Sequence, residues 1–311
     1  MELFRDTHFN FLGRKWWFIL PSLILILAGL TNILVKGPRY STDFKGGVET
    51  DIRWEGAPPV ERIRAAVSSR LAGVSVVAAH DLTGSSEVIV SAELPSGGDV
   101  TTVRQTIDEA LSTISPRYSI RDYQAIGPQI GDDLRHQALM ATAGASGGML
   151  AYLSYRFRLA YGVAAVVAML HDAVITIGLL SLFHQEISLT VVAALLTLIG
   201  YSMNDTIVVF DRVRENRRIS GRESLAETIN RSINQTLSRT VLTSGLTLLT
   251  AVALLLFGGQ VLRGFSLALV IGILVGTFSS IFIASPILLA WEQGHAKWRT
   301  QQRTLSAGGV R

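Results

Sequence analysis

Residues 264–291, GFSLALVIGILVGTFSSIFIASPILLAW, decide the fold, because this run of 28 residues contains no Asp, Glu, Lys or Arg. A helix of roughly 20 apolar residues crosses the hydrocarbon core of a bilayer, which is about 30 Å thick. The sequence has five further long apolar runs, two of which contain a single Asp: 16–35, 136–155, 159–183, 187–210 and 240–262. We therefore predict a polytopic α-helical membrane protein with six transmembrane helices.

Composition and charge exclude several classes of function. The 311 residues are 49% hydrophobic and 17% charged, which disfavours a soluble enzyme. The chain has no cysteine, so disulfides, cysteine nucleophiles and thiolate metal sites are excluded together. Basic residues are in excess next to the apolar runs, and this pattern fits a membrane protein better than a nucleic-acid-binding one.

The basic residues also predict the orientation. On the N-terminal side of the membrane, the segments hold three, two, seven and four Lys or Arg residues, whereas the short connections opposite hold none and one. Basic residues favour the cytoplasmic side. We expect both termini in the cytoplasm, with segment 36–133, which has 10 basic and 14 acidic residues, on the outer side.

This orientation gives five parts. We predict a cytoplasmic N-terminus at 1–15, a first transmembrane helix at 16–35, a periplasmic domain at 36–133, a five-helix transmembrane bundle at 134–291 and a cytoplasmic tail at 292–311. The bundle includes a cytoplasmic, arginine-rich loop at 211–239.

The outer segment alternates between strand and helix patterns. Strand patterns at 48–54, 74–79, 88–94 and 118–126 enclose a helix that follows Pro59 and another that is capped by Asp99. The order β-α-β-β-α-β is that of a ferredoxin-like α+β domain. This segment has no cluster of His or carboxylate residues typical of a metal or catalytic site. Two interpretations stay open: a module that contacts an extracytoplasmic polypeptide or partner, and an inert folded loop.

Ionisable residues inside the apolar runs are the candidate functional residues, because each costs a few kcal/mol in a bilayer unless it is paired or hydrated. Asn204-Asp205 lies in the fourth run, and Arg239 enters the fifth from the same side. Asp205 lies about 9 Å inside the boundary, within reach of a long guanidinium stem. The pair would form a proton-driven switch. The alternatives are a juxtamembrane cation for Arg239 and a structural hydrogen bond for Asn204-Asp205.

A second polar pair, His171-Asp172, lies near the middle of the third run. The sequence leaves open whether it is a proton relay or a satisfied contact between helices. Small residues at 144, 147, 148, 272 and 276 predict close helix contacts. Pro286 predicts a kink in the last transmembrane helix.

Several motifs lie along the chain. One follows the first run and is Asp43-Phe44-Lys45-Gly46-Gly47. The other motifs are Gly200-Tyr201-Ser202-Met203-Asn204-Asp205-Thr206, Val209-Phe210-Asp211-Arg212, Ser238-Arg239-Thr240, the segment 276–286 and His171-Asp172. Together they resemble the SecD/SecF family of bacterial protein-export membrane proteins, nearly end to end and with the SecF half as the nearer match, and the motif at 43–47 resembles that family's signature motif.

The resemblance implies a subunit of resistance-nodulation-division type that uses the proton motive force in late protein translocation across the inner membrane. In that family, Asp205 would carry the proton and Arg239 would be its basic partner. The implied partners are a separate SecD subunit in a heterodimer, the SecYEG channel, YajC and the unfolded polypeptide in transit. No cofactor is implied besides the ion gradient, and neither nucleic acid nor a resident metal is expected.

Rival functions remain at this stage. An intramembrane aspartyl protease would use Asp172 and Asp205, but Ser-Met-Asn precedes Asp205 where such proteases have Gly-x-Gly. A proton-coupled small-molecule exporter needs a larger drug pocket than one small outer domain offers. A non-conducting assembly scaffold is the third alternative. The coupling ion also stays open, since hydroxyls such as Ser202 and Thr206 beside the carboxylate suit Na⁺ as well as H⁺.

Overall fold

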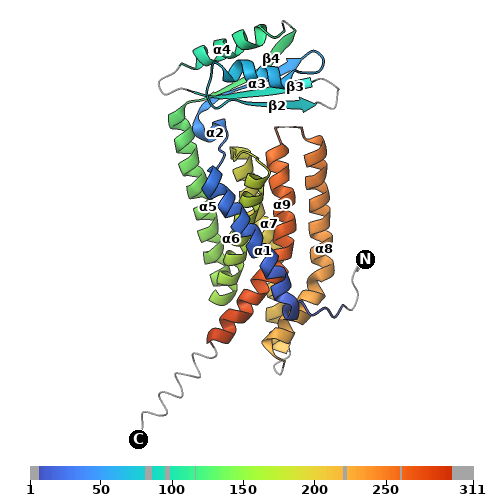
Figure 1. Ribbon diagram of the computed structural model, residues 1–311. Helices are drawn as coiled ribbons and strands as arrows, with labels where there is room; N and C mark the ends of the chain where they lie inside the picture. The colour runs from blue at the N-terminus through green and yellow to red at the C-terminus, as the bar shows by residue number, and fades with distance from the viewer. Residues whose placement is uncertain are drawn as a thin grey trace.

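The computed structural model describes residues 7–80, 86–94, 99–115, 117–219, 223–259 and 261–295, so most of the predicted tail 292–311 lies outside the described residues. A small sheet domain stands on one end of a bundle of long helices (Figure 1). In chain order the elements are α1 (Lys15–Lys36), α2 (Thr42–Lys45), β1 (Gly47–Trp54), α3 (Val60–Ser68), β2 (Ser75–His80), β3 (Ser86–Glu93), α4 (Val100–Ser112), β4 (Tyr118–Ile126), α5 (Pro128–Arg156), α6 (Leu159–Leu182), α7 (Leu189–Ile219), α8 (Leu225–Phe257) and α9 (Arg263–Ser279).

The sheet domain has the predicted alternation of strands and helices. Its four antiparallel strands are arranged in the order β2-β3-β1-β4. Along β1, Val48 and Ile52 are fully buried in a core that includes Ile63 of α3 and Ile107 of α4. Asp99 caps α4 by accepting a hydrogen bond from the Thr101 N–H at 3.2 Å. The strand patterns and this cap explain why the domain could be predicted from its sequence.

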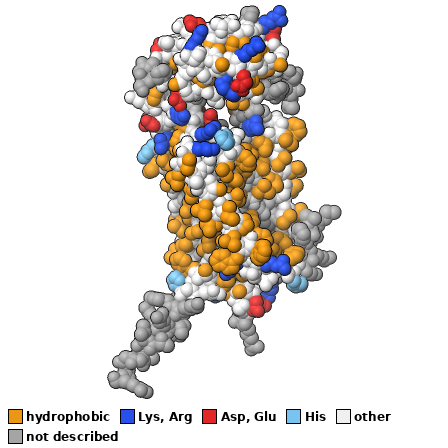
Figure 2. All heavy atoms as spheres, in the orientation of Figure 1, with side chains coloured by type: hydrophobic (Ala, Val, Ile, Leu, Met, Phe, Trp, Pro, Cys, Tyr) orange, Lys and Arg blue, Asp and Glu red, His pale blue; other side chains and the backbone are white. Residues whose placement is uncertain are grey.

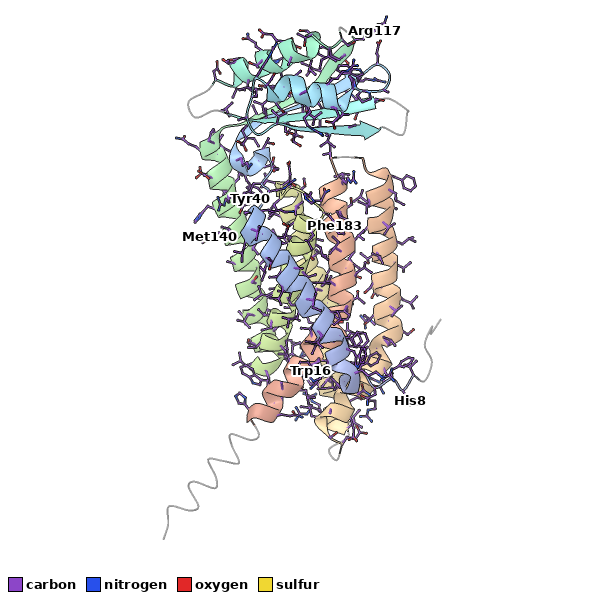
Figure 3. The ribbon with its side chains drawn as sticks, viewed as in Figure 1. His8, Trp16, Tyr40, Arg117, Met140 and Phe183 are labelled. Atoms are coloured by element: carbon purple, nitrogen blue, oxygen red, sulfur yellow. The ribbon has the colours of Figure 1, made fainter. Side chains whose placement is uncertain are left out.

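The helical part consists largely of long apolar helices. Five of the described segments are long and apolar enough to span a membrane: Leu12–Lys36, Leu159–Leu182, Leu189–Ile219, Leu225–Phe257 and Arg263–His295. In Figure 2, hydrophobic side chains cover the visible face of the bundle, while charged ones gather on the sheet domain and at the opposite end. Trp16 lies at that opposite end of α1, as an interfacial aromatic residue would (Figure 3).

The run 136–155 lies within α5, which is not among these five segments. Its many Gly, Ala, Ser and Thr residues lower its hydropathy. α5 begins at Pro128, inside the range assigned to the outer domain, and its 29 residues make it about 44 Å long. Within the described residues of this chain, the expected close contacts at Gly144, Gly147 and Gly148 are not made, because a Cβ at any of them would meet no atom within 4 Å. These glycines lie on an open face of the helix.

The stretch 211–239 is mostly helical, in contrast to the predicted loop. α7 extends well into it and α8 begins within it, so that the two form a hairpin. Ser224 and Glu227 form a capping box at the start of α8. Asn216 Nδ2 of α7 donates to Ser232 Oγ of α8 at 2.8 Å. Arginine is polar and also has a high helix propensity, so the arginines alone did not indicate a loop.

α1 and α6 run side by side in the same direction. Three contacts join residues of α1 to residues 149 positions later in α6. They are Ser22 with His171, Gly29 with Gly178, and Asn32 with Ser181. A constant offset identifies parallel helices in register, and the glycine pair lets the two backbones approach closely.

We expect Gly29→Val to destabilise the protein by about 2 kcal/mol, as overpacking of a tight contact does. A Cβ on Gly29 would lie 2.5 Å from the Gly178 Cα, and a backbone atom cannot move aside without separating the helices. The measurement is thermal unfolding of the purified protein in detergent. Gly245→Val on α8 is the matched control, since a Cβ there meets nothing within 4 Å. An equal loss in both variants would contradict the close α1–α6 contact.

α7 and α9 also approach closely, at the two glycines predicted to do so. A Cβ on Gly272 would overlap the Leu198 side chain, and one on Gly276 would lie 3.0 Å from the Ser202 Cβ. α9 ends in a π-helical turn, Ser280–Ala284, after which the helix continues to His295. Ser285 and then Pro286 follow this turn. A π-helical turn and a proline are both common causes of helix kinks, and the kink at Pro286 stays a prediction.

Candidate functional site

Asp205 is buried between α7 and α8. It is 2% exposed, and its Oδ2 accepts a hydrogen bond of 2.8 Å from Ser244 Oγ of α8. Ser244 is itself 5% exposed. A carboxylate in this position is held by a neutral hydroxyl from the neighbouring helix, so its environment changes whenever α7 and α8 move relative to each other.

Arg239 lies on the same helix as Ser244, just over one turn closer to the cytoplasmic end predicted for the bundle. No hydrogen bond or ion pair joins it to Asp205 in the part of the chain that the structure describes. Arg239 is exposed in a cleft of about 570 Å³ that Asn204 and Asp211 also line. The structure thus brings the predicted residues into one region, but Asn204 faces the cleft and Asp205 faces Ser244.

His171 and Asp172 form the centre of a second buried network. His171 Nδ1 lies 2.9 Å from Asp172 Oδ1, and its Nε2 contacts Ser22 Oγ of α1. Asp172 Oδ2 accepts hydrogen bonds from Ser202 of α7 and Ser279 of α9, each at 2.6 Å. One carboxylate and one imidazole therefore connect four helices: α1, α6, α7 and α9.

The serines of both networks were not among the predicted site residues, although each is a hydroxyl inside an apolar helix. A hydroxyl inside an apolar helix needs a partner, so Ser22, Ser244 and Ser279 marked the helix faces that meet a carboxylate or imidazole. Ser202 had been considered as an ion ligand beside Asp205, but it donates to Asp172 instead. Thr206 donates to the Ser202 carbonyl of its own helix at 3.2 Å.

The signature motif forms a joint between the sheet domain and the bundle. Asp43 Oδ2 accepts a hydrogen bond of 2.9 Å from the Leu189 N–H, so it caps the first turn of α7. Phe44 is 5% exposed, and the Lys45 Nζ lies 2.7 Å from Glu93 Oε1 of β3. The motif thus connects the start of α7 with β3 of the sheet domain.

Both glycines of this motif are needed for close approach. Gly46 has φ +75°, and a Cβ there would lie 2.7 Å from the Pro128 backbone at the start of α5. A Cβ on Gly47 would lie 2.5 Å from the Ala92 carbonyl oxygen. Tyr40, just before the motif, lies between α1 and the sheet domain (Figure 3) and pairs with Ile187 in a short parallel bridge. The sheet domain is thus fastened to the α6–α7 connection and to α5.

Two acidic side chains lie at this joint, and burial raises the pKa of each. For Glu49 of β1, the neighbouring Asp43 carboxylate raises the pKa further. For Glu186, burial outweighs the opposing effect of Lys45 and Arg39. Acids with a raised native pKa bind protons more tightly in the folded protein than in the unfolded chain.

We expect the joint to lose stability as the pH rises. The contribution of Glu49 and Glu186 is fully present below their ordinary pKa of 4.5 and is lost as the pH passes through the higher native values. Amide hydrogen exchange at the start of α7 should therefore be slower near pH 5 than near pH 7.5, after correction for intrinsic rates. Glu49→Gln/Glu186→Gln should remove this difference, whereas Glu61→Gln/Glu109→Gln, at exposed positions, should keep it. A pH difference that survives in the first variant would contradict the prediction.

Among the described residues, no group of three or more His, Asp or Glu side chains is placed to hold a metal ion. The ionisable groups of the two networks are two buried carboxylates, one imidazole and the guanidinium of Arg239 in the adjacent cleft. Such groups bind and release protons, and they change partners when helices shift.

Comparison with known proteins gives consistent matches. The family model described as "Protein export membrane protein SecD/SecF, C-terminal" matches residues 106–294. The protein translocase subunit SecF of Koribacter versatilis is 39% identical over 99% of this chain and 97% of its own length. The SecF subunit of Pseudomonas aeruginosa is 38% identical over 90% of each chain.

Solved structures show the same likeness. The crystal structure of SecDF from Thermus thermophilus, described as a translocon-associated membrane protein, superposes with a TM-score of 0.81 at 37% identity. It covers 93% of this chain, which spans 39% of that longer protein. A second structure, SecDF in a "Super-membrane-facing form", gives a TM-score of 0.72.

Proposed function

The chain belongs to the SecD/SecF family of protein-export membrane proteins, and on this premise we propose that it is an auxiliary subunit of the Sec translocase. In this proposal it uses the proton motive force to promote late steps of protein export across the inner membrane. The observation that carries the proposal is Asp205, a carboxylate buried between α7 and α8 and held by Ser244, with the Arg239 guanidinium in the adjacent cleft.

The proposed cycle turns proton binding into a helix shift. A proton that enters from the outer side neutralises Asp205 and weakens its attraction to Arg239, so that α7 and α8 move apart. Asp43 caps α7 and belongs to the joint under the sheet domain. A shift of α7 would therefore reorient this domain between positions that hold and release an emerging polypeptide. Release of the proton to the cleft resets the site.

The proposal includes the full architecture expected from the sequence. α5 would be the sixth transmembrane helix, with its first turns above the membrane where it meets the joint. The order β2-β3-β1-β4 with two packed helices supports a ferredoxin-like domain on the outer side. Both termini would then be cytoplasmic.

The proposed partners follow from the family. Relatives in which SecD and SecF are fused, such as SecDF of Thermus thermophilus, support a separate SecD subunit as the partner of this chain. Through SecD, the chain would act at the SecYEG channel, with YajC as a further contact. H⁺ is the proposed coupling ion and no cofactor is required.

The test is complementation. Cells depleted of their own SecF are supplied with this chain together with its cognate SecD, and the export of a secreted reporter is followed by pulse-chase. The proposal predicts that processing of the reporter recovers. A membrane-inserted chain that co-purifies with SecD and leaves export at the depleted level would contradict it.

A further inference from the structure

At the end of the bundle opposite the sheet domain, five arginines line a cavity of about 400 Å³: Arg156, Arg158, Arg214, Arg217 and Arg218. They come from the α5–α6 connection and from the last turns of α7. Two aromatic side chains, Phe157 and Tyr161, complete the lining, and both are buried. The cavity is therefore lined by cationic and aromatic side chains.

Among the described residues, no carboxylate lines this cavity. Arg217 lies 3.7 Å from Glu292, and this is the one ion pair that any of the five arginines makes in the described part of the chain. Arg156 and Arg214 lie over the Phe157 ring, with their Cζ atoms 5.2 Å and 5.7 Å from its centroid. Guanidinium groups that surround one concave site repel one another, and a bound anion reduces this repulsion.

The surroundings of the cavity indicate which anion. Tyr155 and Leu159, which flank its Arg156 and Arg158, are 93% and 56% exposed. Exposed aromatic and aliphatic residues beside arginines at a helix end are typical of the membrane–water interface. At that depth the available anions are the phosphates of lipid headgroups, and basic pockets between membrane helices bind such headgroups.

We propose that this cavity binds the phosphate headgroup of an anionic phospholipid. The arginines contact the phosphate oxygens, with Phe157 holding two of the guanidinium groups in place, and the acyl chains lie along the apolar outer surface near Leu159. A bound lipid would tie the α5–α6 connection to the hairpin of α7 and α8. This role is separate from proton coupling at Asp205.

The test is native mass spectrometry of the purified full-length protein, titrated with phosphatidylglycerol, phosphatidylcholine or inorganic phosphate. We expect the wild type to bind phosphatidylglycerol at least tenfold more tightly than phosphatidylcholine. Arg214→Gln/Arg218→Gln should lose at least tenfold in affinity for phosphatidylglycerol. Arg214→Lys/Arg218→Lys keeps the charge but loses the planar fork, and should fall between the two.

The matched control is Arg14→Gln/Lys15→Gln, which removes two basic residues at the start of α1, outside the cavity. We expect its affinity to stay within twofold of the wild type. An equal loss in the control would overturn the proposal in favour of general charge attraction, and phosphate binding as tight as that of the lipid would overturn the lipid as the ligand. If the double variant does not fold, Arg218→Gln alone provides the same comparison.

Discussion

Asp205→Asn is expected to reduce export of a secreted reporter to the level of depleted cells, although the variant reaches normal abundance in the membrane. Asn matches Asp in size, and its Oδ1 can still accept the Ser244 hydrogen bond. It loses the titratable proton and, with it, the negative charge that attracts Arg239 in the proposed cycle. One proton that moves through 100 mV releases about 2.3 kcal/mol, enough to bias a two-state element about 50-fold. Loss of this coupling should therefore affect export far more than stability.

The matched control for this variant is Asp133→Asn, which removes an exposed carboxylate from the first turns of α5. It should export the reporter at the wild-type rate. Co-purification with SecD must be equal for the two variants and the wild type, because a lost complex would mimic lost coupling. Normal export by Asp205→Asn would leave an assembly scaffold as the better account of the protein.

Asp172→Ala is expected to produce the largest loss of stability, about 4 kcal/mol. The substitution removes the acceptor for Ser202 and Ser279 and leaves His171 without its carboxylate partner. Hydrogen bonds to a charged group contribute about 1.5–3 kcal/mol each in soluble proteins, and somewhat less inside membranes. The measurement is the unfolding free energy in mixed micelles with a denaturing detergent.

Asp172→Asn separates the two interpretations of this network. Asn can still accept from Ser202 and Ser279, so it should retain most of the stability that Ala loses. We expect its export activity to follow its stability, because the hydrogen bonds of Asp172 to neighbouring helices account for its role as a structural contact. If Asp172→Asn is as stable as the wild type and yet inactive, the network is a proton relay and the structural interpretation is wrong.

Much of the fold could be predicted because its signals are local. The alternation of Val48 and Ile52 placed one face of β1 in the core, and Asp99 marked the start of α4. Five of the six long apolar runs overlap helices that are long and apolar enough to span a membrane, and the run 159–183 matches Leu159–Leu182 to within one residue. The stretch 211–239 was misjudged because its arginines were taken as the sign of a loop, although Leu225, Ile229 and Ile233 recur at helical spacing and pack into the core.

The site was predicted in part, because charge is visible in a sequence and pairing across helices is not. The cost of burial in lipid pointed to Asp205 and Asp172. Their partners, Ser244 and Ser279, lie on other helices at sequence separations of 39 and 107. Sequence also gave no sign that Asp43 caps α7, since that contact joins residues 146 positions apart. Each of these contacts depends on tertiary packing.

The central claim is that Asp205 couples the proton motive force to translocation. The most direct test measures completion of a preprotein translocation intermediate in inverted inner-membrane vesicles that contain SecYEG, SecD and this chain, with and without an imposed proton gradient. We predict that the gradient accelerates completion in vesicles with the wild-type chain. In vesicles with Asp205→Asn, the acceleration should be no larger than in vesicles that lack the chain. Equal acceleration by wild type and Asp205→Asn would contradict the claim.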